Sequence, residues 1–511
     1  MAQADAPTAD LPAQVRGGGR PFLSAQQRLL AVSAASIALY VITWRLEQAI
    51  FHNRLAVPAS LGDPANAANR SLLLWQMLLY GVLTVLTFAA YLAVVRMCRR
   101  GELTDLRLRR WALGVPIFLN ILCLLWVPLL SQDVYSYLAH GYLGVLPGHN
   151  PFLEPIEVVR DTTLGPPLVA LGWHISPDIT PYGVLWTRLE MSVAALCGDN
   201  VLAAALCFKV IALLASLGSA GLIWRILGHT SPALQLQGTL AYLWNPLVIM
   251  EFAGEGHNDA LMILLSVGAV AACVACRPTL SVIAQLLGFL TKYTCLLFFP
   301  AQLCYLWRTR RSAVQLAAQI TLALLVVIAV AVILYAPLWA GMHTFQGILT
   351  RADTVSSATL SGIAGWLLKH SPLKQMAATI TTALLTLPVL AFIAWSSLRV
   401  NSPAALARTC AWISLAYLLI ASPDYWSWYA CIPVAWIAVG EVGRLFWLAF
   451  LMSLTGRLVA PLELLHVHGY LSWHAAKGTI TALGSLVPLL ALAFWGWRQW
   501  QLGRPVALST R

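Results

Sequence analysis

The stretch VQLAAQITLALLVVIAVAVILYAPLW, residues Val314–Trp339, contains no charged side chain and is long enough to cross a bilayer as one helix. Similar apolar runs recur along the chain of 511 residues, of which 59% are hydrophobic and only 10% charged. A soluble domain carries about 25% charged residues. Together with a mean hydropathy of +0.75, this composition predicts an all-α, polytopic helical membrane protein whose helices pack on each other within lipid.

The apolar runs predict the membrane helices. They cover residues 29–46, 72–97, 111–130, 201–227, 236–252, 260–276, 280–307, 314–339, 376–398, 407–421, 428–439, 445–459 and 479–497. The run at 280–307 is long for one span and carries Lys292 within TKYT. Arg277 and RTRR (Arg308–Arg311) flank this run, and both are expected in the cytoplasm, where short loops are rich in Lys and Arg. Two short helices that meet at TKYT satisfy this parity, which gives about 13–14 membrane helices.

The distribution of charge predicts the sidedness of the protein. The formal net charge is +12, but the basic residues gather in short loops such as Cys98–Arg110, as expected on a cytoplasmic face. We therefore expect no nucleic-acid partner. Residues 1–27 are predicted to be a disordered cytoplasmic tail, and 28–511 a single domain of the cytoplasmic (inner) membrane. Its two larger exterior loops are expected at about 131–200, after the third span, and at about 340–374.

Asp133 opens the first of these exterior loops and precedes the segment VYSYLAHGYL. This segment has an amphipathic pattern that predicts a short helix in the membrane interface, with its tyrosines at headgroup level. Asp133 then has two interpretations. It caps the helix, since Asp is a favoured N-cap, or it is a general base that accepts a proton from a sugar hydroxyl.

The segment WNPLVIMEFAGEGHNDALM, Trp244–Met262, gathers Glu251, Glu255, His257, Asn258 and Asp259 between two apolar runs. A connecting turn in which Asp259 caps the next helix explains GEGHND. However, Glu251 is expected just inside the membrane, where ionisable groups are functional by default. His257 and Asp259 are then candidates to bind hydroxyls or to orient a phosphate. HND is too short for a metal motif, so metal binding is kept only as a minor interpretation and no metal ligand is assigned.

Two further stretches have competing interpretations. Lys292 is either a lysine that snorkels to the interface or a buried cation whose counter-anion is a lipid phosphate. The aromatic turn PDYWSWYACIP, Pro423–Pro433, is explained by an interfacial aromatic belt. The alternative is an aromatic platform for a sugar or an isoprenoid chain.

Taken together, these pieces resemble a known family. DVYSYLAHGYL followed by GHNPF, TPYGVLW (Thr180–Trp186), WNPLV…GEGHNDALM and TKYT is similar to the polyprenol-phosphomannose-dependent α-1,6-mannopyranosyltransferases, which have the membrane-embedded GT-C fold. The similarity covers about residues 131–433. The sequence departs from the family pattern at GHNPF, where G-x-D-P-Y is usual, and at PYGV, where P-Y-G-P is usual.

The resemblance implies a hexosyltransferase that moves a hexose, with mannose expected, from a polyprenyl-phosphate donor to a glycan or glycolipid acceptor at the outer face. By resemblance Asp133 is the catalytic base, and no cofactor is expected. The substrate-binding candidates are Tyr137, Tyr182, Arg188, His257, Asn258, Asp259, Lys292 and Arg351. A carboxylate and a phosphate in one cavity repel each other unless cations lie between them, so Lys292, Arg188 or Arg351 should approach. The alternatives are a transporter or flippase of lipid-linked sugars and a polysaccharide polymerase or ligase of the same architecture.

Overall fold

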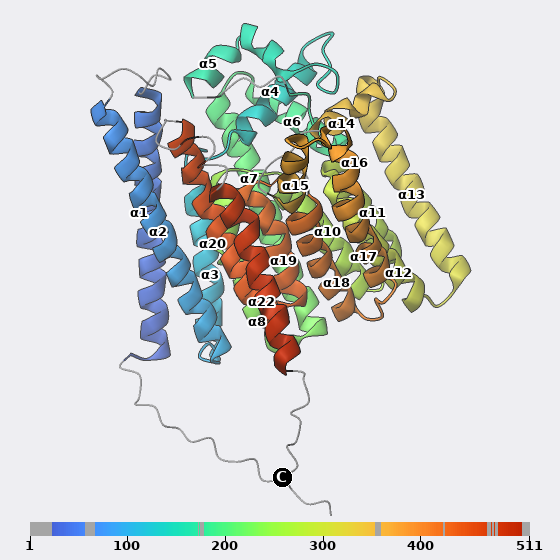
Figure 1. The fold of residues 1–511 in the computed structure, drawn as a ribbon. Coiled ribbons are helices and arrows are strands. Elements are labelled where there is room, and N and C mark those ends of the chain that lie inside the picture. The colour runs from blue at the N-terminus through green and yellow to red at the C-terminus, as the bar shows by residue number, and fades with distance from the viewer. Residues whose placement is uncertain are drawn as a thin grey trace, which may run out of the picture.

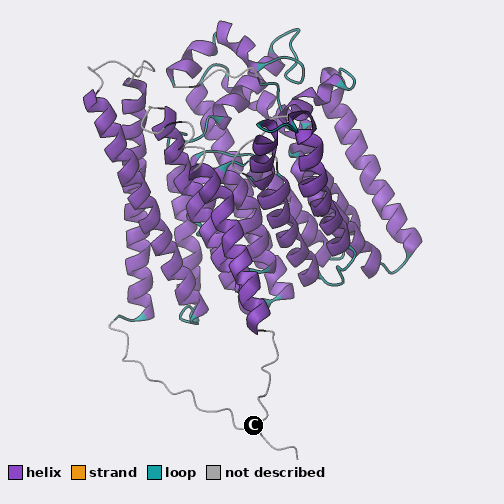
Figure 2. Cartoon of the chain, in the orientation of Figure 1, coloured by secondary structure: helices purple, strands orange, loops and turns teal. Residues whose placement is uncertain are grey.

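The computed structural model describes residues 23–56, 67–171, 173, 178–352, 359–422, 425–467, 472, 475 and 479–502. Throughout these residues the chain forms helices and connecting segments, without strands (Figure 2). The long helices run side by side in one bundle (Figure 1). Residues 1–22 of the expected disordered tail 1–27 lie outside the described residues, whereas Ala25–Gln27 form the start of a helix rather than part of a disordered tail. The all-α, polytopic architecture predicted from composition is confirmed.

Eight of the described helical segments are long and apolar enough to cross a membrane. They are Ala25–His52 in α1 (Ala25–Ala56), Ser71–Arg99 in α2 (Ala67–Arg99), α7 (Val201–Thr230), Ala313–Leu338 with α13 (Ala313–Tyr335), Thr379–Ser397 with α17 (Leu387–Ser397), Pro403–Ala421 with α18 (Pro403–Ala416), Val442–Val459 in α20 (Val442–Val467) and Thr479–Arg498 with α22 (Val487–Leu502). A ninth span is counted if Pro246–Gly254 and Asp259–Val274, which meet at 118°, form one broken crossing.

The remaining predicted runs also form helices, but shorter or more charged ones. They are α3 (Leu106–Cys123), α8 (Gln235–Leu243) with α9 (Pro246–Ile249) and η4 (Met250–Gly254), α10 (Asp259–Val274), α11 (Pro278–Thr291), η5 (Tyr293–Phe298), α12 (Phe299–Thr309), η11 (Ser427–Ala430) and α19 (Cys431–Gly440). α3, for example, has three arginines among its first five residues, and α11 and α12 are each too short to cross alone. The number of full-length described spans is therefore lower than the number of apolar runs.

The helix break predicted at TKYT is present. α11 ends at Thr291, Lys292 has an extended backbone (φ −149°, ψ 125°), and η5 and α12 follow. The chain then turns back, since Gln302 on α12 donates a side-chain hydrogen bond to Ser281 on α11. These two short helices form an antiparallel hairpin, which returns the Arg308 end of α12 to the end of the bundle that holds Arg277.

Shorter helices cover the opposite end of the bundle (Figure 1). The predicted exterior region 131–200 folds into α4 (Asp133–Val145), η2 (Ile156–Asp161), α5 (Gly165–Ala170) and α6 (Val184–Cys197). α14 (Gln346–Ala352) lies beside it (Figure 1), and α15 (Leu360–Lys369) follows α14 in the chain. The expectation that the tyrosines of α4 sit at headgroup level is wrong for Tyr135 and Tyr137. Both are buried in the protein, with 1% and 0% exposure, because α4 packs on α6 and α7.

A close backbone approach joins this covering region to the helix break. The Gly183 N–H donates to Thr291 O at 3.1 Å, and a Cβ at Gly183 would lie 2.1 Å from Leu290 O. Only glycine allows this contact without a shift of the backbone. The PYGV turn is thereby held against the end of α11, which brings Tyr182 next to the TKYT break.

Candidate active site

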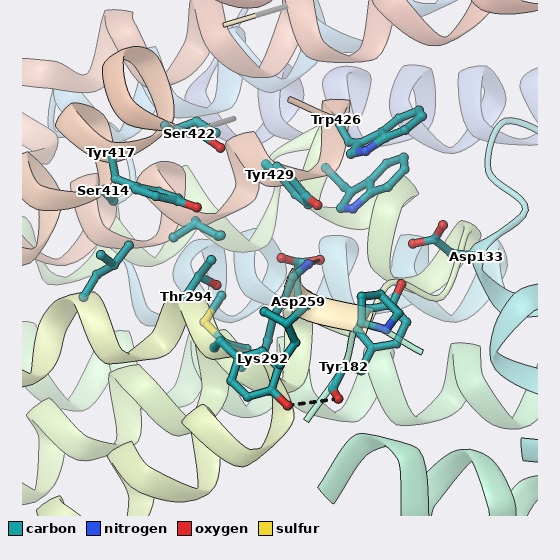
Figure 3. Close-up of a pocket in the computed structure, with 18 of the residues that line it drawn as sticks. Asp133, Tyr182, Asp259, Lys292, Thr294, Ser414, Tyr417, Ser422, Trp426 and Tyr429 are labelled. Carbon is teal, nitrogen blue, oxygen red and sulfur yellow. Dashed lines mark hydrogen bonds and ion pairs between the residues drawn. The ribbon is translucent and has the colours of Figure 1, made fainter. Parts of the chain in front are cut away.

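A cavity of about 430 Å³ lies where α4, α10, η5, η11 and α18 meet. Figure 3 shows Asp133 at one end, Ser414 and Tyr417 at the other, and Asp259 and Lys292 between them. Among the described residues that line the cavity, Asp133, Asp178 and Asp259 are acidic and Lys292 is basic. The Asp133 end is polar, whereas Leu418, Ile432 and Phe298 contribute apolar wall.

Asp133 is the first residue of α4, and its side chain does not cap the helix. The N-cap is Gln132, which makes no side-chain capping bond, and the Asp133 N–H donates to Ser131 Oγ at 3.1 Å. The carboxylate points to other partners. Its Oδ2 accepts from the Tyr137 hydroxyl at 3.2 Å and lies 3.3 Å from His257 Nδ1. The side chain keeps 26% exposure, so the carboxylate is both held and reachable from the cavity.

His257 is fully buried and is surrounded by protein groups. Nε2 lies 3.2 Å from Glu251 Oε2, and Nδ1 faces Asp133. The ring stacks on Trp428, with centroids 3.9 Å apart and planes at 16°. Both ring nitrogens thus face a carboxylate at ion-pair distance, an arrangement that favours the imidazolium over the neutral ring. The preceding Gly256 has φ +79°, a conformation that glycine adopts at no steric cost, and it turns His257 toward Asp133.

Glu251 continues this series of contacts into the bundle. Its Oε1 lies 3.1 Å from Arg457 Nη1, and the other guanidinium nitrogen lies 3.3 Å from Glu47 Oε1 and 4.0 Å from Glu255 Oε1. Arg457 has 0% exposure. Sequence reasoning missed Arg457 as part of the site and did not predict its contact with Glu47. The signal was available, because a charged residue inside an apolar span is functional by default.

Lys292 and Asp259 form an ion pair on the cavity wall. Lys292 Nζ lies 2.7 Å from Asp259 Oδ2, and the side chains have 13% and 0% exposure. The ammonium also lies 4.6 Å from the centroid of the Tyr429 ring. Asp259 is the first residue of α10, and the N-cap is Asn258, without a side-chain capping bond. The interpretation of Asp259 as a helix cap is therefore wrong.

The other candidate residues are distributed unevenly. Tyr182 lines the cavity, and its ring meets that of Tyr137 edge-on at 5.3 Å. Asn258 is buried, its N–H faces the Tyr137 hydroxyl at 3.4 Å, and its side-chain amide has no protein hydrogen-bond partner. Arg188 does not line the cavity, and its Nε donates to Leu334 O at 2.8 Å. Arg351 belongs to α14, and its side chain lies outside the described residues.

The aromatic turn after α18 forms part of the cavity wall. Trp426, Trp428 and Tyr429 all line it, and the two indoles stack with centroids 5.2 Å apart and planes at 13°. The stack continues onto His257. These three rings therefore face a protein cavity rather than form a lipid-facing belt. Pro423 and Asp424 lie outside the described residues.

The fold is a multi-pass helical bundle, and a network of buried charged side chains lies beside a partly apolar cavity. These features define a membrane protein with a polar site inside its helix bundle. The chain belongs to the α-(1→6)-mannopyranosyltransferase family, because the family model described as alpha-(1->6)-mannopyranosyltransferase, N-terminal domain, matches residues 30–331. That match includes Glu47, Asp133, Glu251 and His257, and ends before Trp428 and Arg457.

Named relatives agree with this assignment. The chain is 30% identical over 290 residues to alpha-(1->6)-mannopyranosyltransferase A of Mycobacterium tuberculosis, an alignment that covers 53% of this chain and 51% of the relative. It is 32% identical over 144 residues to alpha-(1->6)-mannopyranosyltransferase A of Corynebacterium glutamicum, which covers 28% of each. The chain thus spans about half the length, or less, of these relatives.

Proposed function

We propose that this protein is an integral membrane mannosyltransferase that uses a polyprenyl-phosphate-linked mannose as donor and a glycan or glycolipid as acceptor. The observation that carries the proposal is the placement of Asp133 and Lys292 on one cavity. A carboxylate and an ammonium on one wall supply a proton acceptor and a positive charge for a leaving phosphate. The family match and the names of the relatives support mannose as the sugar.

The proposed reaction is a single displacement at the anomeric carbon. The acceptor hydroxyl attacks C1 of the donor sugar, Asp133 takes the hydroxyl proton, and the bond from C1 to the phosphate oxygen breaks. Polyprenyl phosphate leaves with the electron pair, and C1 inverts its configuration. Stabilising the charge on the leaving phosphate is the main electrostatic demand of the step, and Lys292 is the cation that lines the described cavity.

The shape of the cavity supports a lipid-linked donor. The charged groups gather near Asp133 and Lys292, while Leu418, Ile432 and Phe298 line it with apolar surface, which suits an isoprenoid chain. In Figure 1 the covering helices α4 and α6 lie at the end of the bundle opposite to the ends of α2 and α12, whose last turns carry arginines. Arginine-rich ends are expected in the cytoplasm, so we propose that the cavity opens toward the exterior of the cytoplasmic membrane.

The test is a transfer assay with the purified protein in lipid vesicles. Labelled polyprenyl-phosphate mannose is the donor, and a short α-(1→6)-linked mannoside is the acceptor. The wild type should transfer label, and Asp133→Asn should reduce kcat by about 10²- to 10⁴-fold, because the proton acceptor is lost. Asn has nearly the same size and shape as Asp and is equally well accepted at a helix N-terminus, so the variant should fold normally.

Asp178→Asn is the matched control, since Asp178 also lines the cavity and undergoes the same change. It should keep most of the activity. Wild-type protein that transfers no mannose from this donor would contradict the proposed function. Near-normal transfer by Asp133→Asn would instead remove Asp133 from the role of base.

A further inference from the structure

A series of six charged or ionisable side chains begins at Asp133 and runs into the interior of the bundle. In order they are Asp133, His257, Glu251, Arg457 and then Glu47 and Glu255. Each of the last five has at most 1% exposure. A buried charged group costs several kcal/mol in solvation unless it is paired. Burying these charged groups inside a membrane bundle therefore has a large cost in solvation free energy. A simple connecting turn would not require them.

His257 differs from Asp133 because neither the nitrogens nor the faces of its ring are open to the cavity. Asp133 and Glu251 take the two nitrogens, and Trp428 covers one face at 3.9 Å. Its side chain has 0% exposure. His257 is therefore not placed to bind a substrate hydroxyl or phosphate. It can act on the reaction only through Asp133.

Arg457 anchors the other end of this contact series. Its two terminal nitrogens contact different carboxylates. Nη1 lies 3.1 Å from Glu251, and Nη2 lies 3.3 Å from Glu47. Glu251 also accepts a hydrogen bond from Ser427 Oγ at 3.3 Å, next to the Trp428 that stacks on His257. The guanidinium fork thus fixes the orientation of Glu251, and Glu251 together with the Trp428 stack fixes the orientation of His257.

We propose that His257, Glu251 and Arg457 are positioning residues that hold the Asp133 carboxylate oriented and ionised for proton transfer, with Arg457 as the anchor. This inference rests on the proposed function of Asp133 as the base. The anchor lies on α20, outside the part of the chain that the family model matches. Helix α20 would therefore contribute to the reaction without touching a substrate.

The inference predicts a pH effect, so every charge that faces His257 matters. Asp133 faces it from α4 and Glu251 from η4. Glu255 belongs to the same turn, and the Lys209 side chain of α7 packs against Gly256, while η11 contributes the uncharged Trp428. An imidazolium next to Asp133 favours the carboxylate over the carboxylic acid. When that positive charge is weakened, the acid limb of the pH–kcat curve should move to higher pH.

The key comparison is Glu251→Gln against Glu47→Gln, with kcat, KM and the pH profile measured in the vesicle assay. Both variants remove one buried carboxylate from the same guanidinium, but only Glu251 leads to Asp133. Glu251→Gln should lower kcat by about 100-fold, as a displaced catalytic group does, and should move the acid limb to higher pH. KM for donor and acceptor should not change, because Glu251 touches neither substrate. Glu47→Gln should keep kcat and the pH profile close to wild type.

Arg457→Lys tests the anchor. Lysine keeps the charge but lacks the planar fork that holds two carboxylates. We expect a lower kcat with an unchanged acid limb. If Glu251→Gln does not yield folded protein, His257→Gln provides the same measurement, since it leaves the Glu251–Arg457 pair intact.

The outcomes separate the two proposals. If wild type transfers mannose and Asp133→Asn does not, yet Glu251→Gln and Glu47→Gln share one kcat and one pH profile, the positioning role is wrong and the proposed function stands. An unchanged kcat in Arg457→Lys would remove the anchor. Absence of transfer by wild type is a failure of the proposed function itself.

Discussion

The Lys292–Asp259 pair allows a quantitative test of the cavity as a phosphate site. The perturbation is Lys292→Met, which keeps the length of the side chain and removes its charge. The two charges lie 2.7 Å apart, so their attraction is roughly 6 kcal/mol at an effective dielectric constant of about 20. Part of this attraction offsets the cost of burying both groups. Breaking a buried pair on one side costs about 3–5 kcal/mol.

The single variant therefore combines two effects, a loss of stability and a loss of the cation for the donor phosphate. Stability falls because Asp259 stays charged, with 0% exposure, and has lost its cation. The double variant Lys292→Met with Asp259→Asn removes both charges and should recover most of the lost stability. It does not restore a cation for the donor phosphate. A hydrogen bond to a charged group contributes about 1.5–3 kcal/mol, so KM for the donor should rise about 10- to 100-fold in both variants.

The assay combines thermal unfolding in detergent with a donor titration in vesicles. Arg188→Met is the control, since Arg188 is a cation that does not line the cavity. It should leave KM for the donor unchanged. A double variant with normal stability and wild-type KM would refute the assignment of Lys292 to the phosphate. A single variant as stable as wild type would show that the pair contributes less than its geometry indicates.

Three further predictions concern stability and sidedness. Burial raises the pKa of Glu190 on α6 well above its usual range, so the folded protein holds a proton there that the unfolded chain loses above about pH 4.5. Stability should therefore fall as pH rises above that value, by up to about 1.4 kcal/mol per pH unit, and Glu190→Gln should flatten this slope in melts at pH 6 and pH 8. Gly183→Ala should destabilise by about 1–3 kcal/mol, because its Cβ would lie 2.1 Å from Leu290 O, whereas Gly81→Ala, with nothing within 4 Å, should not destabilise. An alkaline-phosphatase fusion after Pro166 should be active and one after Arg311 inactive, and the reverse pattern would invert the proposed sidedness.

Several features of this protein followed from the sequence because they depend on local properties of the chain. Apolar runs of sufficient length identify membrane helices wherever they pack. The break at TKYT was also predictable, because a lysine in the middle of a long run and arginines at both of its ends violate the parity of a single crossing. Lys292 was found as an isolated charge within an apolar run, whereas Asp133 was found as the acid that follows such a run, and its role as base came from the family resemblance.

The tertiary structure decided which of these groups meet. Glu251 and Arg457 are 206 residues apart in sequence, and Arg457 and Glu47 are 410 apart, so no local pattern links them. Sequence alone also left Asp133 and Asp259 with two interpretations each, a helix cap or a functional carboxylate, since both roles need the same residue type at the start of a helix. Which role each aspartate has depends on where His257 and Lys292 lie. The packing of α4, α10 and the α11–α12 hairpin determines these positions. Hydropathy gives each helix its place in the membrane, but the pairing of buried charges is set only when helices distant in sequence come into contact.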